Sequence, residues 1–279
     1  MHIVKYKILT RNIVSMVLLV IIFYFNYGHG KMEGQQSLEQ QVVLIVIFDN
    51  ISFSPQLKTE WGYSCVIQTG KDTLLFDTGS NGKILLSNMS KLNIDPHSIK
   101  TVIISHAHWD HLGGLTDFLQ VNPHVTVYIP YSFSKKIETG IVQSGANVVR
   151  VDSSREIVTD IFSLGELNTG IPEQSIALNI PTGMVIVTGC AHPGIVNIIK
   201  HAQSLFPDKP IYLALGGFHL KGDNSGKIKQ IVNSIKELKV QNVAPSHCTG
   251  EKAMEIFKQT YQHNYIKSGV GKKIVISTK

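Results

Sequence analysis

The sequence predicts a layered α/β fold. Short runs rich in β-branched residues alternate with amphipathic helical patterns along most of the 279 residues, an alternation typical of strands and helices that share one core. Hydrophobic residues make up 43% of the chain, which is enough to bury a large core. Hairpins in each half, followed by further strands and helices, favour two mixed sheets with helices on their outer sides.

The strand-like runs of the first half are rich in β-branched residues and cover residues 41–48, 64–69, 73–76, 101–105 and 125–129. The runs at 64–69 and 73–76 enclose a Gly-Lys-Asp turn, so we expect them to form a hairpin. Residues 101–105 are apolar almost throughout, as in strands buried on both faces. Helical patterns occupy residues 83–92 and 112–119.

The second half repeats this alternation without repeating the sequence. Its strand-like runs cover residues 176–180, 184–188, 211–215 and 273–277. Its helical patterns cover residues 193–205, 226–238 and 251–262. We therefore expect one folded domain over residues 41–279, preceded by a polar linker at residues 31–40.

The N-terminus predicts a targeting segment. Lys5, Lys7 and Arg11 precede a run at residues 13–25 that is apolar except for one serine. A membrane span needs about 20 residues, so this run has the length of a signal-peptide core. We expect residues 1–30 to be a signal peptide or an uncleaved membrane anchor, which implies export to the periplasm or exterior, or attachment to the membrane through this segment alone.

The net charge of +6 does not predict a nucleic-acid partner. Part of the excess lies in the first eleven residues, and the remaining basic residues are scattered among acidic ones without a Lys/Arg run or interleaved aromatics. A solvated surface is the better interpretation of this charge.

The chemistry of the chain is concentrated directly after residues 101–105, in the stretch His106-Ala-His108-Trp-Asp110-His111. Side chains two positions apart on an extended backbone point to the same side, so His106 and His108 can share one metal ion through neutral ring nitrogens. Asp110 and His111 follow at a turn and can face a second ion. Gathering these polar groups without a metal would cost desolvation energy, so we expect a metal site.

At this stretch the chain resembles the metallo-β-lactamase superfamily, whose signature is His-x-His-x-Asp-His after a buried strand. Other stretches resemble one branch of it, which contains archaeal dihydropterin-(ribofuranosyl)aminobenzene-phosphate synthase and many bacterial relatives known only as metal-dependent hydrolases. The stretches that resemble this branch are residues 60–64, 189–197, 216–220 and 247–250. Phe76-Asp77-Thr78-Gly79 resembles a strand-end motif of the whole superfamily. The resemblance runs over residues 42–258 and implies an αββα sandwich of two mixed sheets with outer helices.

The resemblance also implies a centre with two metal ions. The implied ligands are His106 and His108 for the first ion, and Asp110, His111 and His247 for the second. Asp77 would support the metal-binding loop from behind. Most relatives place a further ligand of the first ion before the strand at residues 184–188, but no histidine occurs between His124 and His192. Either His192 takes that role from an unusual place, or the position is empty.

The three cysteines cannot all pair in disulfides. Cys65 lies in a strand-like run and is expected to be a small buried residue. Many relatives with two metal ions have an aspartate where this chain has Cys190, directly after the strand at residues 184–188. A thiolate binds zinc, so Cys190 is either a ligand beside His192 or a packed small residue. Cys248 would normally point away from its neighbour His247.

His219 follows an apolar strand and two glycines, which makes it a candidate for substrate binding or proton transfer; the alternative is a hydrogen-bonded loop histidine. Asp110 is a candidate to orient the nucleophile as well as to bind metal.

An anionic substrate is predicted from two helix starts. A helix expected to begin at Pro193 would aim free N–H groups, including that of Gly194, at the site. A second helix, beyond Thr249 and Gly250, would add a positive end with Lys252 in its first turn. The alternative is that Pro193 and Gly250 merely shape turns.

The ligand types suit two divalent ions, with Zn²⁺ favoured and Fe or Mn compatible. Such ions lower the pKa of bound water from about 15.7 toward about 7 and thereby supply hydroxide. The favoured function is hydrolysis of a phosphorylated or ester-like anionic small molecule. One alternative is a transferase that joins an arylamine to a dihydropterin, against which the export signal counts. The other is a non-catalytic metal-binding module, against which the intact ligand set counts.

Overall fold

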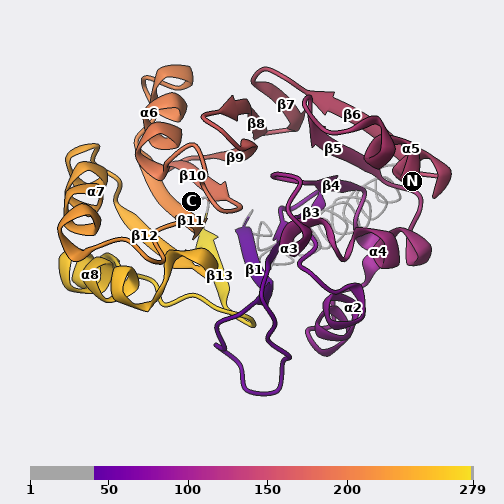
Figure 1. Cartoon of the computed structure of the whole chain (residues 1–279), viewed down its shortest axis with the longest axis horizontal. Helices are drawn as coiled ribbons and strands as arrows, with labels where there is room; N and C mark the ends of the chain where they lie inside the picture. The colour runs from indigo at the N-terminus through magenta and orange to yellow at the C-terminus, as the bar shows by residue number, and fades with distance from the viewer. Residues whose placement is uncertain (1–40, 278–279) are drawn as a thin grey trace, which may run out of the picture. The chain divides into compact units, whose positions relative to one another are not determined.

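Two β-sheets lie face to face in the computed structural model, which describes residues 41–277 (Figure 1). The strands of the first sheet are β1 (Gln41–Asp49), β2 (Tyr63–Gln68), β3 (Thr73–Phe76), β4 (Thr101–Ile103), β5 (Thr126–Pro130), β6 (Asn147–Val151) and β13 (Lys273–Ser277). Those of the second are β7 (Arg155–Val158), β8 (Ile161–Asn168), β9 (Pro172–Ile180), β10 (Gly183–Thr188), β11 (Ile211–Gly217) and β12 (Asn242–Ser246). The orders are β13-β1-β2-β3-β4-β5-β6 and β12-β11-β10-β9-β8-β7.

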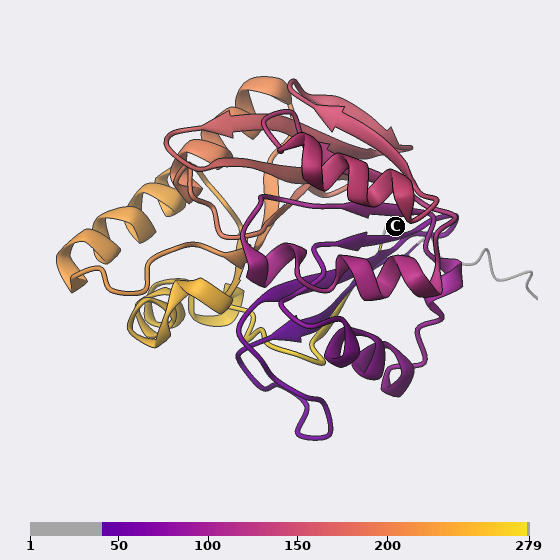
Figure 2. The same cartoon turned by 45° about the vertical axis from the view of Figure 1, so that its right-hand side comes forward.

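Helices cover the outer faces of both sheets (Figure 2). The first sheet carries α2 (Gly82–Lys91), α3 (Trp109–Leu112), α4 (Leu115–Val121) and α5 (Lys135–Gln143), and the second carries α6 (Ile195–Leu205), α7 (Ser225–Glu237) and α8 (Glu251–Tyr261). Short 3-10 turns occur at η1 (Pro96–Ser98), η2 (His247–Thr249) and η3 (Gln262–Asn264). This arrangement confirms the predicted αββα sandwich.

Alternation along the central strands explains the layers. In β1, Leu44 and Val46 pack between the two sheets, while Ile45 and Ile47 pack under the helices of the first sheet. Cys65 is fully buried in the layer between the sheets, as predicted. Strands that are apolar on both faces cannot be exposed to water on either side, so the sequence requires both a second sheet and outer helices.

The predicted elements differ from the structure mainly at their ends. The hairpin is confirmed, with Gln68 opposite Thr73. The helix predicted at residues 112–119 is instead two short helices, α3 and α4, separated by Gly113-Gly114. A Cβ at Gly114 would overlap the carbonyl oxygen of Thr78, so this turn packs directly on the backbone that follows β3. The helix predicted from Pro193 begins only at Ile195, after a turn in which Gly194 has a positive φ of 90°.

Sequence patterns missed α5 and strands β6, β7, β8 and β12. β6 and β7 are short edge strands and are largely half-exposed, so their hydrophobic signal is weak. β8 contains a register shift around Gly165, which breaks its alternation. β12 contains Pro245, which is tolerated because β12 lies at the edge of its sheet.

The predicted signal peptide or anchor at residues 1–30 and the linker at residues 31–40 lie outside the described residues. Within residues 41–277, no helix combines the length and apolar character that crossing a bilayer requires. The described residues belong to one compact unit.

Candidate metal centre

The candidate ligands come from loops at the carboxyl ends of strands. β3, β4 and β5 are parallel neighbours in the first sheet, and β10, β11 and β12 in the second. Loops at the carboxyl ends of parallel strands meet at one edge of a sheet. The loop after β4 carries His106 and His108, the loop after β10 carries Cys190 and His192, and η2 carries His247.

Three histidines form the first donor group. His106, His108 and His192 each offer a ring nitrogen within 4.8 Å of the others. Their ring centroids are 4.7, 4.6 and 4.9 Å apart, and the planes stand at 70° to 88° to one another. The Nε2 atom of His106 is buried and has no hydrogen-bond partner among the described residues, which is the expected state of a metal-ligating nitrogen. His192 thus lies where the third ligand of the first ion was required.

Glu173, which sequence reasoning missed, orients His192. Its Oε2 accepts hydrogen bonds from Nδ1 of His192 at 2.7 Å and from the backbone N of the same residue at 2.9 Å. Its Oε1 accepts the backbone N–H groups of Cys190 and Ala191, both at 2.9 Å. Because Nδ1 donates to this carboxylate, the Nε2 of His192 keeps its lone pair.

The environment holds Glu173 in its charged form although the side chain is fully buried. Burial opposes ionisation, but the hydrogen bond from His192 and the nearby His106 outweigh it and lower the pKa of Glu173 to about 2. An internal negative charge therefore lies directly behind the first donor group.

Asp77 supports a histidine of each donor group. It follows β3 directly and lies in the left-handed region, with φ of 56°. Its Oδ2 accepts the Ser105 hydroxyl at 2.7 Å and contacts Nδ1 of His111 at 2.6 Å, while Oδ1 accepts the Ser105 backbone N at 2.7 Å. The Ser105 oxygen then accepts from Nδ1 of His106 at 2.8 Å. A Cβ at Gly189 would overlap the Ser105 hydroxyl, so only glycine fits there.

Replacing Asp77 by asparagine is expected to lower zinc affinity about 10- to 100-fold while the fold is kept. The amide can present an N–H group to His111 Nδ1 and so favour the tautomer that carries its proton on Nε2, where a ligand needs its lone pair. Competition with a chromogenic zinc chelator measures the affinity. Asp95→Asn is the matched control, because Asp95 caps η1 with an oxygen that asparagine retains. Unchanged zinc affinity in Asp77→Asn would contradict the assigned role.

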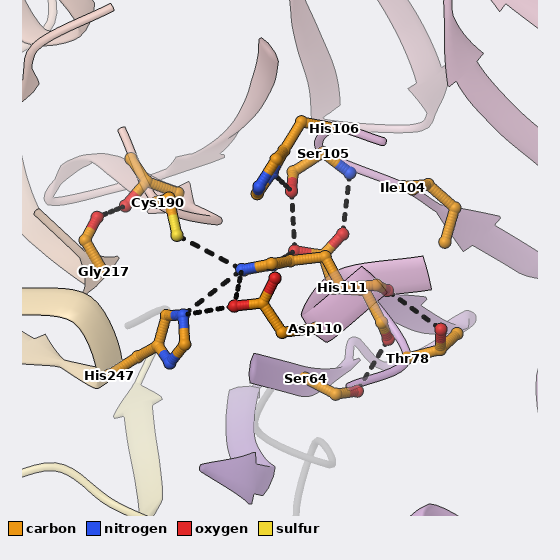
Figure 3. A network of polar contacts seen from close by, with 12 residues as sticks. Ser64, Thr78, Ile104, Ser105, His106, Asp110, His111, Cys190, Gly217 and His247 are labelled. Atoms are coloured by element: carbon orange, nitrogen blue, oxygen red, sulfur yellow. Dashed lines mark hydrogen bonds and ion pairs between the residues drawn. The ribbon is translucent and has the colours of Figure 1, made fainter. Parts of the chain in front are cut away.

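Four buried side chains form the second donor group, namely Asp110, His111, Cys190 and His247 (Figure 3). The Nε2 atoms of His111 and His247 are 3.3 Å apart. Asp110 Oδ2 lies 3.7 Å from the first and 3.4 Å from the second, and the Cys190 sulfur lies 3.2 Å from His111 Nε2. The four ligand atoms lie within 4.8 Å of one another, close enough to bind a single metal ion.

The hydrogen bonds on the far sides of the two rings show that the group fits a cation. His111 Nδ1 donates to Asp77, and His247 Nδ1 lies 2.8 Å from the acceptor Oδ1 of Asn50. In the neutral rings both Nε2 atoms therefore carry lone pairs that face each other. A divalent ion between them relieves this repulsion and satisfies both atoms.

Protonation states suit metal binding. Burial lowers the pKa values of His106 and His111 to about 3, so both rings are neutral near pH 7. Partial burial opposes ionisation of Asp110, but its hydrogen bond with His247 and the nearby histidines hold its pKa below the ordinary value. Burial would lower the pKa of His247, but its hydrogen bond to Asp110 and nearby negative groups raise it. A metal ion competes with that proton for the same nitrogen.

Cys190 lies within the second donor group and is almost fully buried. Its thiol pKa is raised, first by its interaction with Cys248 and then by burial. The Cys248 sulfur contacts the carbonyl oxygen of Cys190 at 3.7 Å. The sulfur of Cys190 faces His111 (Figure 3).

His219 lies at the border of the first group, and its ring centroid is 4.5 Å from that of His192. It offers a nitrogen to a third set of donors with Cys190 and His192. Its side chain is exposed, and its pKa is raised, mainly by the Cys248 side chain. This placement permits contact with a substrate bound at the first group.

The other residues predicted for substrate binding are placed differently from expectation. The N–H of Gly194 is not free, because it donates to the carbonyl of Ala191 at 2.8 Å. Thr249 is buried, and its hydroxyl accepts the N–H of Phe218 at 3.0 Å. Lys252 is exposed and lines a small pocket with the 220–223 segment. Lys221, absent from the sequence-based candidates, lines this pocket and also the cavity beside His247, which Lys252 does not line.

Strained backbone accompanies the centre. Asp77, Ala191, His219 and His247 have φ values of 56°, 59°, 50° and 50°. Residues other than glycine adopt this left-handed region infrequently, and such strain concentrates at functional sites. The loops are therefore shaped for the positions of these side chains.

Comparison with known proteins agrees with this geometry. The sequence profile of the Metallo-beta-lactamase superfamily matches residues 62–173. The chain is 28% identical over 248 residues to the 7,8-dihydropterin-6-methyl-4-(β-D-ribofuranosyl)-aminobenzene-5′-phosphate synthase of Methanocaldococcus jannaschii, an alignment that covers 73% of this chain and 84% of that relative.

Solved structures share the fold. Tm1679, described as a metal-dependent hydrolase of the β-lactamase superfamily, has a TM-score of 0.72 and 28% identity, covering 85% of this chain and 99% of its own. The metallo-β-lactamase fold protein YhfI from Bacillus subtilis has a TM-score of 0.63 with the same coverage. Its identity of 16% supports the shared fold only.

Proposed function

The chain belongs to the metallo-β-lactamase superfamily, and from this premise we propose that it is a metal-dependent hydrolase of an anionic small molecule with a phosphorylated or ester-like group. One observation carries the proposal: in two adjacent donor groups, four of the five histidines have one ring nitrogen held by Asp77, Glu173, Asn50 or Ser105, which leaves the other nitrogen for a metal. Such orientation from behind is the usual arrangement of histidines that bind catalytic metals.

Under this proposal, His106, His108 and His192 hold one ion, and Asp110, His111 and His247 hold the other, with Cys190 as a further donor to the second. When bound, two divalent ions supply hydroxide at neutral pH and polarise the electrophile. Asp110 is ionised and is placed to orient the attacking group as well. His219, with its raised pKa, is placed to hydrogen-bond the substrate or to protonate a leaving group.

Metal analysis of the purified protein, combined with a substrate screen, tests the proposal. We expect two Zn²⁺, Fe or Mn ions per chain and turnover of at least one phosphodiester, phosphomonoester or lactone that stops on treatment with a chelator and returns with metal. Metal bound in that ratio without turnover of any ester would instead support a non-catalytic metal-binding role.

A transferase is the second candidate, and the similarity to the M. jannaschii synthase favours it. The screen therefore includes a dihydropterin pyrophosphate with an arylamine acceptor. Release of pyrophosphate that depends on the acceptor would identify a transferase, whereas release without acceptor would identify a hydrolase.

Inorganic phosphate is expected to inhibit hydrolysis competitively, because two cations and the nearby Lys221 attract an anion. Raising the ionic strength should weaken the inhibition, since salt screens these charges. Initial rates at several phosphate concentrations, with sodium chloride at matched ionic strength as control, measure the effect. Turnover of a neutral lactone that is unaffected by millimolar phosphate would count against an anionic substrate and leave the metal site intact.

A further inference from the structure

A cavity of about 500 Å³ lies beside the second donor group. Its lining includes Trp61, Lys221, His247, Glu251 and Met254. His247 belongs both to the cavity wall and to the donor group, and Asn50, which contacts its Nδ1, lines the cavity as well, so the cavity adjoins the metal centre across the His247 ring.

The wall of the cavity pairs an aromatic face with a cation. The Nζ atom of Lys221 lies 4.3 Å from the centre of the Trp61 ring, and that ring lies 4.9 Å from the His247 ring. Within residues 41–277, Lys221 forms no ion pair, in contrast to Lys135 and Lys227. Its ammonium group lies instead over the π-face of a half-buried tryptophan.

The backbone of Lys221 is fixed although its side chain is exposed. Its N–H donates to the carbonyl of Cys248 at 3.1 Å, one residue beyond His247. Gly250, with φ of 81°, packs against it so closely that a Cβ there would lie 3.0 Å from the Lys221 Cα. The base of the lysine is thus held beside the metal centre, while its ammonium group can move.

We propose that this cavity binds the aromatic part of an anionic substrate, and that Lys221 leaves the Trp61 face to pair with the anionic group. The inference rests on the proposed function only in placing the reacting group at the metals. A cation over a ring that is partly open to water is held weakly, whereas a charge-assisted hydrogen bond to an anion is stronger. The vacated face of Trp61, with Met254 nearby, then stacks on an aromatic ring.

Glu251 sets the orientation of this ligand. It lines the same cavity and forms no ion pair within the described residues, so it repels negative charge on its side. We therefore expect the anionic group to lie toward Lys221 and away from the Glu251 carboxylate. Lys252, although next to Glu251, lines the adjoining pocket and not this cavity, which makes it a matched control for Lys221.

Tryptophan fluorescence tests the proposal without any turnover. The sequence has two tryptophans, so in a Trp109→Phe background all tryptophan emission comes from Trp61. The zinc-loaded protein is titrated with phenylphosphonate, whose P–C bond resists hydrolysis, and with methylphosphonate, which carries the same anion without the ring. We expect phenylphosphonate to change Trp61 emission and to bind at least about fivefold more tightly than methylphosphonate.

In the same background, Lys221→Met is expected to raise the Kd of phenylphosphonate about tenfold or more, because one charge-assisted hydrogen bond is lost. Lys252→Met is expected to leave this Kd unchanged. Circular dichroism and zinc content confirm that both variants are intact. Equal Kd values for the two phosphonates, or an unchanged Kd in Lys221→Met, would overturn the proposal even if zinc-dependent hydrolysis is found. Failure of every ester to react would instead reject the hydrolase and leave this binding test valid.

Discussion

Replacing His108 by alanine is expected to remove one of the two bound metal ions and to lower kcat/KM about 10²- to 10⁴-fold. His108 supplies one of three nitrogens in the first donor group, and two remaining histidines bind a divalent ion much more weakly. Loss of an ion that stabilises transition-state charge is worth several kcal/mol, which corresponds to this range of rates. His108 is only partly buried, so its removal leaves the core unchanged.

Elemental analysis of the dialysed protein measures the metal content, and steady-state kinetics measure the rate. His97→Ala is the matched control, because His97 is an exposed histidine on η1 that contacts neither donor group. Wild-type metal content in the His108→Ala protein would refute the assignment of the first donor group.

Replacing Glu173 by alanine is expected to lower the free energy of unfolding by about 3–5 kcal/mol. The carboxylate accepts three backbone N–H groups and the Nδ1–H of His192, all in or near the protein interior. Removing it leaves these donors without an acceptor, and each such buried group costs about 1–3 kcal/mol unless water enters. His192 also loses its orientation, so metal at the first group should fall as well.

Urea denaturation in the presence of a chelator measures this loss without a contribution from bound metal. Glu166→Ala is the control, since Glu166 accepts only one backbone N–H, that of Ser132, at a half-exposed position. It should cost about 1 kcal/mol or less. A Glu173→Ala protein as stable as this control would show that water or a rearranged loop replaces the carboxylate.

Periodicity predicted the layers of this fold because the central strands are apolar on both faces. Strands at the sheet edges, such as β6 and β7, were missed since half-exposed residues carry no such pattern. The remaining errors, in the bounds of two predicted helices, come from the shapes of loops. The turn at Gly113-Gly114 divides a predicted helix, and α6 starts two residues after Pro193.

For the site, a short motif after a buried strand was sufficient to bring His106, His108, Asp110 and His111 together. Of the groups behind the ligands, Asp77 was predicted from the resemblance, whereas Glu173 and Asn50 were not, because their roles depend on contacts between distant segments. Glu173 lies on β9 and meets a loop after β10, and Asn50 meets His247 across 197 positions. Glu173 stands next to Gln174 and Ser175 at the polar start of β9, so the sequence carries no signal that marks it as a buried carboxylate.

Lys221 was not among the predicted residues for a similar reason. The expectation relied on a helix start close to His247 in sequence, whereas the cation beside His247 in space comes from the loop after β11. Proximity along the chain indicates proximity in space only within a helix or strand of known direction.

The loop of residues 190–192 folds around an anion that belongs to the protein itself. In many proteins, consecutive backbone N–H groups form a nest that closes only when a phosphate or other anion arrives from solution. Here Glu173 fills that nest permanently, so the loop keeps its shape whatever occupies the metal positions. We therefore expect the loop to keep its shape when a metal ion is removed with a chelator and added back.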